Sequence, residues 1–289
     1  MITERAFAKV NLGLAVIARR GDGFHELDTM FALIGLHDDV SGSPAVHCSL
    51  EVMVEGAVPG ADALTGAMGD NVALQAARAF QDATGSGGAS LRLVKRIPVA
   101  AGLGGGSADA AAVLRIMARL YPEHQASVDL EALARQLGSD VPFMLSGQRA
   151  ARGRGRGERL EPIGLPELHV VLVNPGVSVM VQDAYAELQN FSRRPKHAVL
   201  IEAIREGRDP RWINALQPGV TRQRPAIREA ITALRAAGLH GVLMSGSGAT
   251  CFGIAADGRS AAAEIAAALQ AEYPQWWVRA DCTGTGEPG

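Results

Sequence analysis

The sequence predicts an α+β protein, because its strands and helices are mixed without the regular alternation of a doubly wound sheet. Alternating apolar and polar residues near the N-terminus indicate a strand, and later stretches bounded by capping residues and glycines indicate helices. The 289 residues suffice for one large domain or two ordinary ones. A composition of 47% apolar and 20% charged residues is typical of a globular chain with a sizeable core.

The first half of the chain is predicted to begin with a strand. Residues 4–17 alternate with a period of two, which puts Lys9 and Asn11 on one face, about 7 Å apart. We expect Ser107, Ser127 and either Ser139 or Asp140 to be helix N-caps. The later elements are expected in this order: strand 46–54, a helix from Asn71 to about Phe80, strand 91–97, a helix from Ser107, helix 127–137 and a short helix from Asp140.

A stretch rich in glycine and arginine, residues 149–158, is predicted to be a domain junction or a hairpin. We therefore divide the chain into an N-terminal domain, residues 1–158, and a C-terminal domain, residues 159–289. The elements expected in the second half are strand 168–173, helices near 180–190, 197–206 and 224–237, a strand–turn–strand over 243–252, helix 260–272 and strand 276–278.

Composition excludes several classes of protein. The net charge of −2 does not favour binding to nucleic acid or to an anionic membrane. The three cysteines are widely spaced, so we expect neither a disulfide framework nor a zinc knuckle. Without a signal-like N-terminus or a run of about 18 apolar residues, we expect a cytoplasmic protein. Three of the 28 basic residues are lysines, which raises the question of what arginine could not do at those positions.

The strongest chemical signal is the segment PVAAGLGGGSAD, which begins at Pro98. Four of the five residues from Gly102 to Gly106 are glycines, directly before the expected helix at Ser107. Glycines let the backbone approach a ligand closely, and a helix N-terminus attracts anions, so a polyphosphate is the expected ligand. A simple flexible turn would not need so many glycines. No lysine follows as in a P-loop, and the dinucleotide fingerprint lacks its last glycine.

A second glycine turn, Gly246–Ser247–Gly248, lies between two short expected strands. It could approach the same phosphates, brace the first glycine segment, or be an ordinary hairpin turn. The arginine-rich run 152–156 also has three interpretations: a solvated hairpin, attraction of a diphosphate, or RNA binding.

Three motifs in this order resemble those of the GHMP kinases: AKVNL at 8–12, PVAAGLGGGSADAA at 98–111 and LMSGSGATCF at 243–252. The resemblance implies an N-terminal ATP-binding domain similar to ribosomal protein S5, a ferredoxin-like C-terminal domain and a site between them. Three further segments, at 21–25, 138–143 and 174–178, resemble members whose substrate carries a cytidine diphosphate headgroup. The expected reaction is ATP-dependent phosphorylation of the 2-hydroxyl of the methylerythritol moiety of such a substrate.

The resemblance also implies roles for single residues. Asp140 would be the base, Lys9 its charge partner and Asn11 a residue that positions the substrate. His25 would read the cytosine edge, with Phe24 and Tyr185 as aromatic walls of its slot. The expected ATP contacts are Asn71, Lys95, Pro98, Gly102, Leu103, Gly104, Gly105, Gly106 and Ser107. Mg²⁺ is expected to accompany ATP, with Ser107 as a possible ligand. Phosphorylation of another small alcohol, such as homoserine or mevalonate, and an inactive nucleotide sensor remain alternatives.

Overall fold

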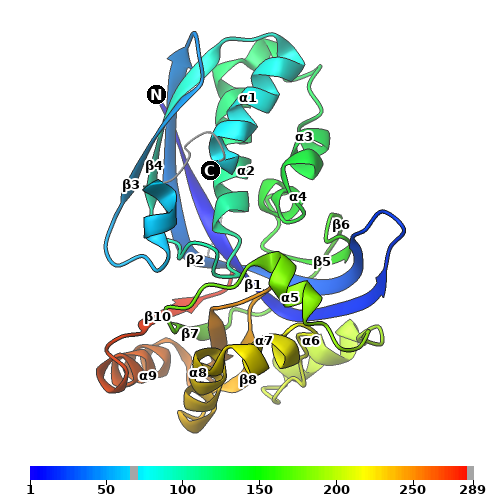
Figure 1. The fold of residues 1–289 in the computed structure, drawn as a ribbon, viewed down its shortest axis with the longest axis vertical. Helices are drawn as coiled ribbons and strands as arrows, with labels where there is room; N and C mark the ends of the chain where they lie inside the picture. The colour runs from blue at the N-terminus through cyan, green and yellow to red at the C-terminus, as the bar shows by residue number, and fades with distance from the viewer. Residues whose placement is uncertain (66–70, 285–289) are drawn as a thin grey trace.

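The computed structural model describes residues 1–65 and 71–284, and its first half is a sheet covered by helices on one face (Figure 1). The strand order is β3-β4-β2-β5-β6, and β1 pairs with β2. The strands are β1 Ile2–Arg19, β2 His25–Ala45, β3 Ser49–Val54, β4 Gly88–Lys95, β5 Ala150–Gly155 and β6 Arg159–Pro162. The helices are α1 Val72–Thr84, α2 Gly105–Leu120, α3 Leu130–Leu137 and α4 Val141–Leu145.

The second half forms a smaller sheet with helices packed against it. Its strands are β7 His169–Asn174, β8 His240–Met244, β9 Cys251–Ile254 and β10 Trp277–Cys282. Its helices are α5 Val181–Ala186, α6 His197–Arg205, α7 Gln217–Gln223, α8 Pro225–Ala236 and α9 Gly258–Glu272. The antiparallel order β10-β7-β9-β8, with α8 before β8 and α9 before β10, is a ferredoxin-like arrangement. The α+β class and the ferredoxin-like second half are therefore confirmed.

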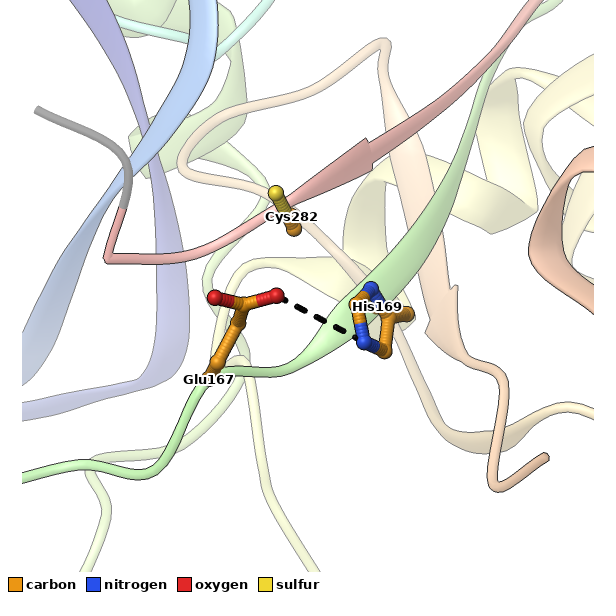
Figure 2. Close-up of side chains that lie close together, drawn as sticks. All are labelled: Glu167, His169 and Cys282. Atoms are coloured by element: carbon orange, nitrogen blue, oxygen red, sulfur yellow. Dashed lines mark ion pairs between the residues drawn. The ribbon is translucent and has the colours of Figure 1, made fainter. Parts of the chain in front are cut away.

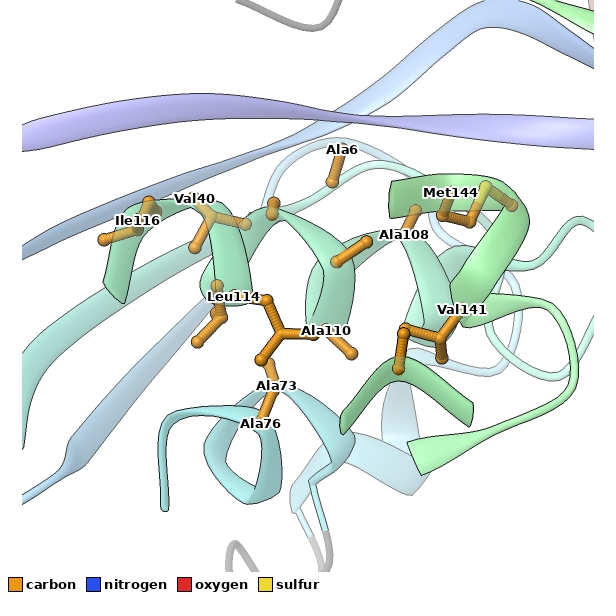
Figure 3. Close-up of a cluster of buried hydrophobic side chains, with 14 of the residues drawn as sticks. Ala6, Val40, Ala73, Ala76, Ala108, Ala110, Leu114, Ile116, Val141 and Met144 are labelled. Atoms are coloured by element: carbon orange, nitrogen blue, oxygen red, sulfur yellow. The ribbon is translucent and has the colours of Figure 1, made fainter. Parts of the chain in front are cut away.

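Helix α2 is the centre of the first core (Figure 3). Its alanines, among them Ala108 and Ala110, are buried, and small side chains let α1 pack closely through Ala73 and Ala76. Most of the helix surface is covered by the sheet, α1 or α4, which explains why it is apolar nearly all round. This burial fixes the position of the N-terminus of α2 relative to the sheet.

Strand β2 is the largest element that the sequence analysis missed. Its middle is a run of apolar residues without alternation, because both faces of the strand are buried. Phe31 and Leu33 pack into the core under α2, whereas Met30 and Ile34 pack against the second sheet. The sheet is thus enclosed by helices on one side and by the C-terminal half on the other.

The last strand joins the two halves. The Asp281 carboxylate in β10 accepts hydrogen bonds from the backbone N–H groups of Gly35 and Leu36, at 2.9 and 2.7 Å. An isolated bridge between Ile34 and Thr283 lies beside them. β2 is therefore bound directly to the C-terminal sheet. None of the helices in the described ranges is both long and apolar enough to span a bilayer.

Several element boundaries differ from the prediction. Helix α2 begins at Gly105 with Gly104 as its N-cap, so Ser107 lies inside the first turn and is not the cap. Gly104 has a left-handed backbone, which ends the loop without a side-chain cap. Helix α3 begins at Leu130, because the Asp129 side chain accepts the Ala132 N–H and supplies the cap expected from Ser127.

The arginine-rich stretch, residues 149–158, is part of a hairpin, which was one of the two predictions for it. Strand β5 pairs with β6 in antiparallel fashion, and both belong to the first sheet. The first sheet therefore extends to Pro162, and the expected division after residue 158 falls inside this hairpin. Helix α7 was not expected, and the other predicted helices and strands of the second half are present with shifted ends.

Candidate active site

The glycine segment, residues 102–106, lies between β4 and α2, where the two halves of the chain meet. Gly102 has a φ of 77°, and a Cβ there would collide with the carbonyl oxygen of Ser245 at the end of β8. The Ser245 hydroxyl donates to the Gly102 carbonyl at 2.9 Å, and the Thr250 N–H donates to Ala101 at 3.1 Å. The turn between β8 and β9 therefore contacts the back of the glycine segment, as one of its three interpretations predicted.

The other side of the glycine segment is open. A Cβ on Gly106 would meet no atom within 4 Å, and this residue is exposed in the first turn of α2. The first backbone N–H groups of a helix have no partner within it and carry partial positive charge. An anion can therefore approach the N-terminus of α2 from this side.

The Lys9 ammonium lies behind the glycine segment and uses three acceptors. Its Nζ is 2.6 Å from Asn11 Oδ1, 3.0 Å from the Gly102 carbonyl and 3.3 Å from Asp140 Oδ2. An ammonium has three donors, so these contacts satisfy all of them. Lys9 is 3% exposed and joins β1, the glycine segment and the cap of α4.

The space around Lys9 is narrow. A Cβ on Gly104 would lie 3.1 Å from Lys9 Cε, and one on Gly246 would lie 3.3 Å from its Nζ. A planar guanidinium is larger and holds its donors in a fixed fork. This packing explains why lysine, and not the arginine that the chain otherwise favours, stands here.

Asn11 and its neighbours form a network of hydrogen bonds next to Lys9. The Asn11 amide donates to the Thr29 hydroxyl at 2.9 Å, and this hydroxyl donates to the Gly13 carbonyl at 2.6 Å. The backbone N–H of Asn11 donates to the Ser245 hydroxyl. Asn11 is 2% exposed, and both its amide oxygen and its amide nitrogen have a partner, so it holds Lys9 in position.

Asp140 is the N-cap residue of α4, but its side chain makes no capping hydrogen bond. Its carboxylate is 29% exposed and faces the Lys9 ammonium. Tyr185 also lies nearby, since burial and the charge of Asp140 both raise the pKa of its hydroxyl. The structure thus brings together the three residues Lys9, Asn11 and Asp140.

The aromatic residues are only partly assembled as expected. His25 and Tyr185 are stacked, with centroids 4.7 Å apart and planes inclined by 21°. Burial and the charge of Arg19 lower the pKa of His25, which keeps its ring neutral near pH 7. Phe24 is not part of this stack: it is 49% exposed, and the Arg156 guanidinium lies 4.7 Å from its centroid.

Of three expected ATP contacts, two have structural partners of their own and the third is buried. Asn71 caps α1 through its side-chain oxygen, which accepts the Ala73 N–H at 2.9 Å. Pro98 is buried. Lys95 lies below the glycine segment, where its Nζ is 3.4 Å from the Cβ position of Gly105. It is 3% exposed and is paired with Asp38 and Asp109.

Asn214 is a site-forming residue that the sequence analysis missed. Its side-chain nitrogen donates to the carbonyls of Met244 and Gly246, at 2.8 and 2.7 Å. It is 4% exposed and holds the turn that braces the glycine segment. The available signal was an asparagine between the apolar residues Ile213 and Ala215.

In the part of the chain that the structure describes, two places offer candidate metal ligands. Ser107, in the first turn of α2, is half-buried. Glu167, His169 and Cys282 form a separate cluster (Figure 2). This cluster is at the end of β7 opposite Asn174, whose amide reaches Thr250 beside the glycine segment. Its nitrogen and sulfur ligands are also a poor match for Mg²⁺, so it is not the expected magnesium site.

Substitution of Gly102 by alanine is expected to destabilise the protein by about 2–4 kcal/mol, from the left-handed backbone and the collision with Ser245. Gly106→Ala is the matched control, because its Cβ meets open space in a helix. We expect G106A to be more stable than the parent by about 0.5–1 kcal/mol. Urea unfolding of both variants measures these values, and equal stabilities would contradict the described brace.

The buried cluster of Lys95, Asp38 and Asp109 predicts an effect of pH on the stability of the fold. Burial raises the pKa of Asp109 from its ordinary 3.8 to about 7, and Asp38 acts in the same direction against Lys95. Because the folded pKa is above the unfolded one, this group stabilises the fold below about pH 4, and its contribution is lost as pH rises toward 7. D109N should therefore gain stability relative to the parent over this range, by at most about 1.4 kcal/mol per pH unit. Parallel stability–pH curves from chemical denaturation would contradict this.

The fold and the site together define the class of protein: a two-domain α+β protein whose glycine-rich helix N-terminus, next to a buried lysine–carboxylate pair, can bind an anion. Comparison with known proteins is consistent with this class. Residues 71–148 match the family model described as GHMP kinases N terminal domain, and residues 191–275 match the one described as GHMP kinases C terminal. The chain belongs to the GHMP kinases.

Relatives and solved structures narrow the comparison. The chain is 45% identical to the 4-diphosphocytidyl-2-C-methyl-D-erythritol kinase of Deinococcus radiodurans, over 94% of this chain and 90% of that protein. It is 43% identical to the enzyme of that name from Thermus thermophilus, over 98% and 96%. A crystal structure of a 4-(cytidine 5'-diphospho)-2C-methyl-D-erythritol kinase superposes with a TM-score of 0.82, at 41% identity, covering 99% of this chain and all of that one.

Proposed function

We propose that this protein transfers the γ-phosphate of ATP to the 2-hydroxyl of 4-diphosphocytidyl-2-C-methyl-D-erythritol. The observation that carries the proposal is the 43–45% identity to kinases of that name over nearly the whole chain. The geometry supports it, since a carboxylate paired with a buried lysine lies beside an anion-binding helix terminus. Lys9 and Asp140 are both present and in contact, which favours an enzyme over an inactive nucleotide sensor.

In this proposal the chain mainly positions the two reactants and neutralises the charge of the phosphates, as phosphoryl transfer requires. The glycine segment and the N-terminus of α2 bind the polyphosphate through backbone N–H groups. Lys9 holds Asp140 in place and keeps its carboxylate next to a positive charge. Asp140 accepts the proton of the substrate hydroxyl late in the reaction.

The headgroup is proposed to bind at the pair formed by His25 and Tyr185. Their stacked rings provide an aromatic surface for a pyrimidine, and a neutral imidazole can both donate and accept at its edge. Homoserine and mevalonate contain no ring that would use such a surface. Mg²⁺ would neutralise charge on the phosphates, and the Ser107 hydroxyl fits as one oxygen ligand.

The experiment that tests this proposal measures ADP release by the full-length protein with Mg²⁺-ATP and one alcohol at a time. We expect release only with the cytidine diphosphate substrate, and a product with a new phosphate on its 2-hydroxyl. Faster release with homoserine or mevalonate would contradict the substrate. Absence of release with every alcohol, while a non-hydrolysable ATP analogue binds, would contradict the enzyme.

A further inference from the structure

The face of the first sheet opposite to Lys9 carries a second group of basic residues. In the antiparallel register, Phe31 is opposite Asn11, so both point to the side of the active site. Their neighbours in β2 point the other way. On that far side Asp28 is opposite Arg154, and Arg154 is opposite Arg159 in β6. One row of side chains therefore crosses three strands on the face away from the candidate active site.

The two arginines of this row are among the residues that line a pocket of about 310 Å³. The lining residues are Glu26, Arg152, Arg154, Arg159 and Arg194. Four arginines and one glutamate give this surface a positive character, whereas the chain as a whole has a net charge of −2. The volume is at the small end of the range for small-molecule sites.

Two of the lining arginines, Arg152 and Arg194, contact Asp28, which is fully buried behind them. Its carboxylate accepts two hydrogen bonds from Arg152, at 2.9 and 2.7 Å, and pairs with His197 Nε2 at 2.5 Å. Arg194 lies 3.4 Å from the same carboxylate. Residues of both halves of the chain thus meet at one carboxylate, and this fixes the position of Arg152.

The arginines at the rim have donors to spare. Within the described residues, the nearest acid to Arg154 is Glu161 at 3.8 Å, and the nearest to Arg159 is Glu158 at 4.0 Å. Both distances exceed that of a hydrogen bond. A guanidinium has five donors, and its flat fork matches the oxygens of a phosphate. The two rim arginines can therefore bind a ligand without breaking a close ion pair.

We propose that this pocket binds a small molecule bearing a diphosphate, at a site separate from the glycine segment. Several converging guanidiniums favour a diphosphate over a single carboxylate, because bidentate contacts to phosphate oxygens are the strong ones. The positive surface is confined, since Glu26 and Glu161 stand beside it. A long nucleic acid would meet these acids, so a compact anion is the better match.

The test is calorimetric titration of the full-length protein with inorganic pyrophosphate, while a saturating non-hydrolysable ATP analogue occupies the glycine segment. We expect one pyrophosphate to bind per chain. Binding should weaken at least tenfold in R154Q/R159Q and should also weaken in R194Q, a variant on a different segment. The matched control is R228Q/R235Q, with the same loss of charge from exposed positions of α8, and it should bind within twofold of the parent.

Other results would overturn the proposal. These are no pyrophosphate binding by the parent, binding unchanged in R154Q/R159Q, or an equal loss in the α8 control. Displacement of pyrophosphate by a single-stranded RNA that binds more tightly would assign the surface to nucleic acid instead. ADP release by R154Q/R159Q should match the parent, because these side chains point away from Lys9 and Asp140.

Discussion

Replacement of Asp140 by asparagine lowers kcat by about 10²- to 10⁴-fold, the range for loss of a general base. An amide has nearly the same shape as the carboxylate but cannot accept the proton of the substrate hydroxyl. The Lys9 ammonium keeps its contacts with Asn11 and Gly102, so the loop and its anion site stay in place. Affinity for a non-hydrolysable ATP analogue should therefore change less than threefold.

The measurements are the rate of ADP release at saturating substrate and calorimetric binding of the analogue. Asp129→Asn is the matched control: Asp129 is also an N-cap, and asparagine caps a helix equally well. We expect D129N to turn over at the parental rate. A D140N variant as active as D129N would exclude Asp140 as the base.

Lys9→Arg is the second change with a large expected effect, although it keeps the charge. Guanidinium atoms would press on Gly104 and Gly246, and the fixed fork cannot reach the acceptors from Asn11, Gly102 and Asp140 together. Each lost charge-assisted hydrogen bond costs about 1.5–3 kcal/mol, equivalent to roughly a ten- to hundredfold loss. We expect kcat/KM to fall at least a hundredfold and the thermal midpoint to fall with it.

Lys196→Arg is the control for this substitution. Lys196 is exposed at the start of α6 and makes no side-chain capping contact. ADP release and thermal unfolding of K196R should match the parent. If K9R retained parental activity, charge alone would suffice at this position and the described packing around Lys9 would have no role in catalysis.

Local patterns in the sequence were enough to find much of this site. The period of two over residues 4–17 predicted β1 and the shared face of Lys9 and Asn11, because pleated backbones alternate their side chains. The glycines from Gly102 to Gly106 predicted a loop before a helix. The prediction of where that helix begins was wrong, since a left-handed Gly104 replaces the side-chain cap that Ser107 was expected to provide.

Contacts between distant segments could not be read in this way. Phe24 was expected to face Tyr185, but His25 occupies that position, and Phe24 lies next to the Arg156 guanidinium instead. Strand β2 had no alternation to reveal it, because two different layers cover its two faces. Asn214 acts through carbonyls about 30 residues away in the chain, and spacing alone does not indicate such contacts.

The sequence by itself therefore determined the α+β class, the glycine-rich loop before a helix and the face that presents Lys9. These depend on period, capping and glycine content, which act over a few residues. Only the tertiary structure decided that Lys9 bridges β1, the glycine segment and Asp140, and that the arginines of β5 face away from them. Strand register and domain packing set these relations, because they depend on which distant surfaces are buried together.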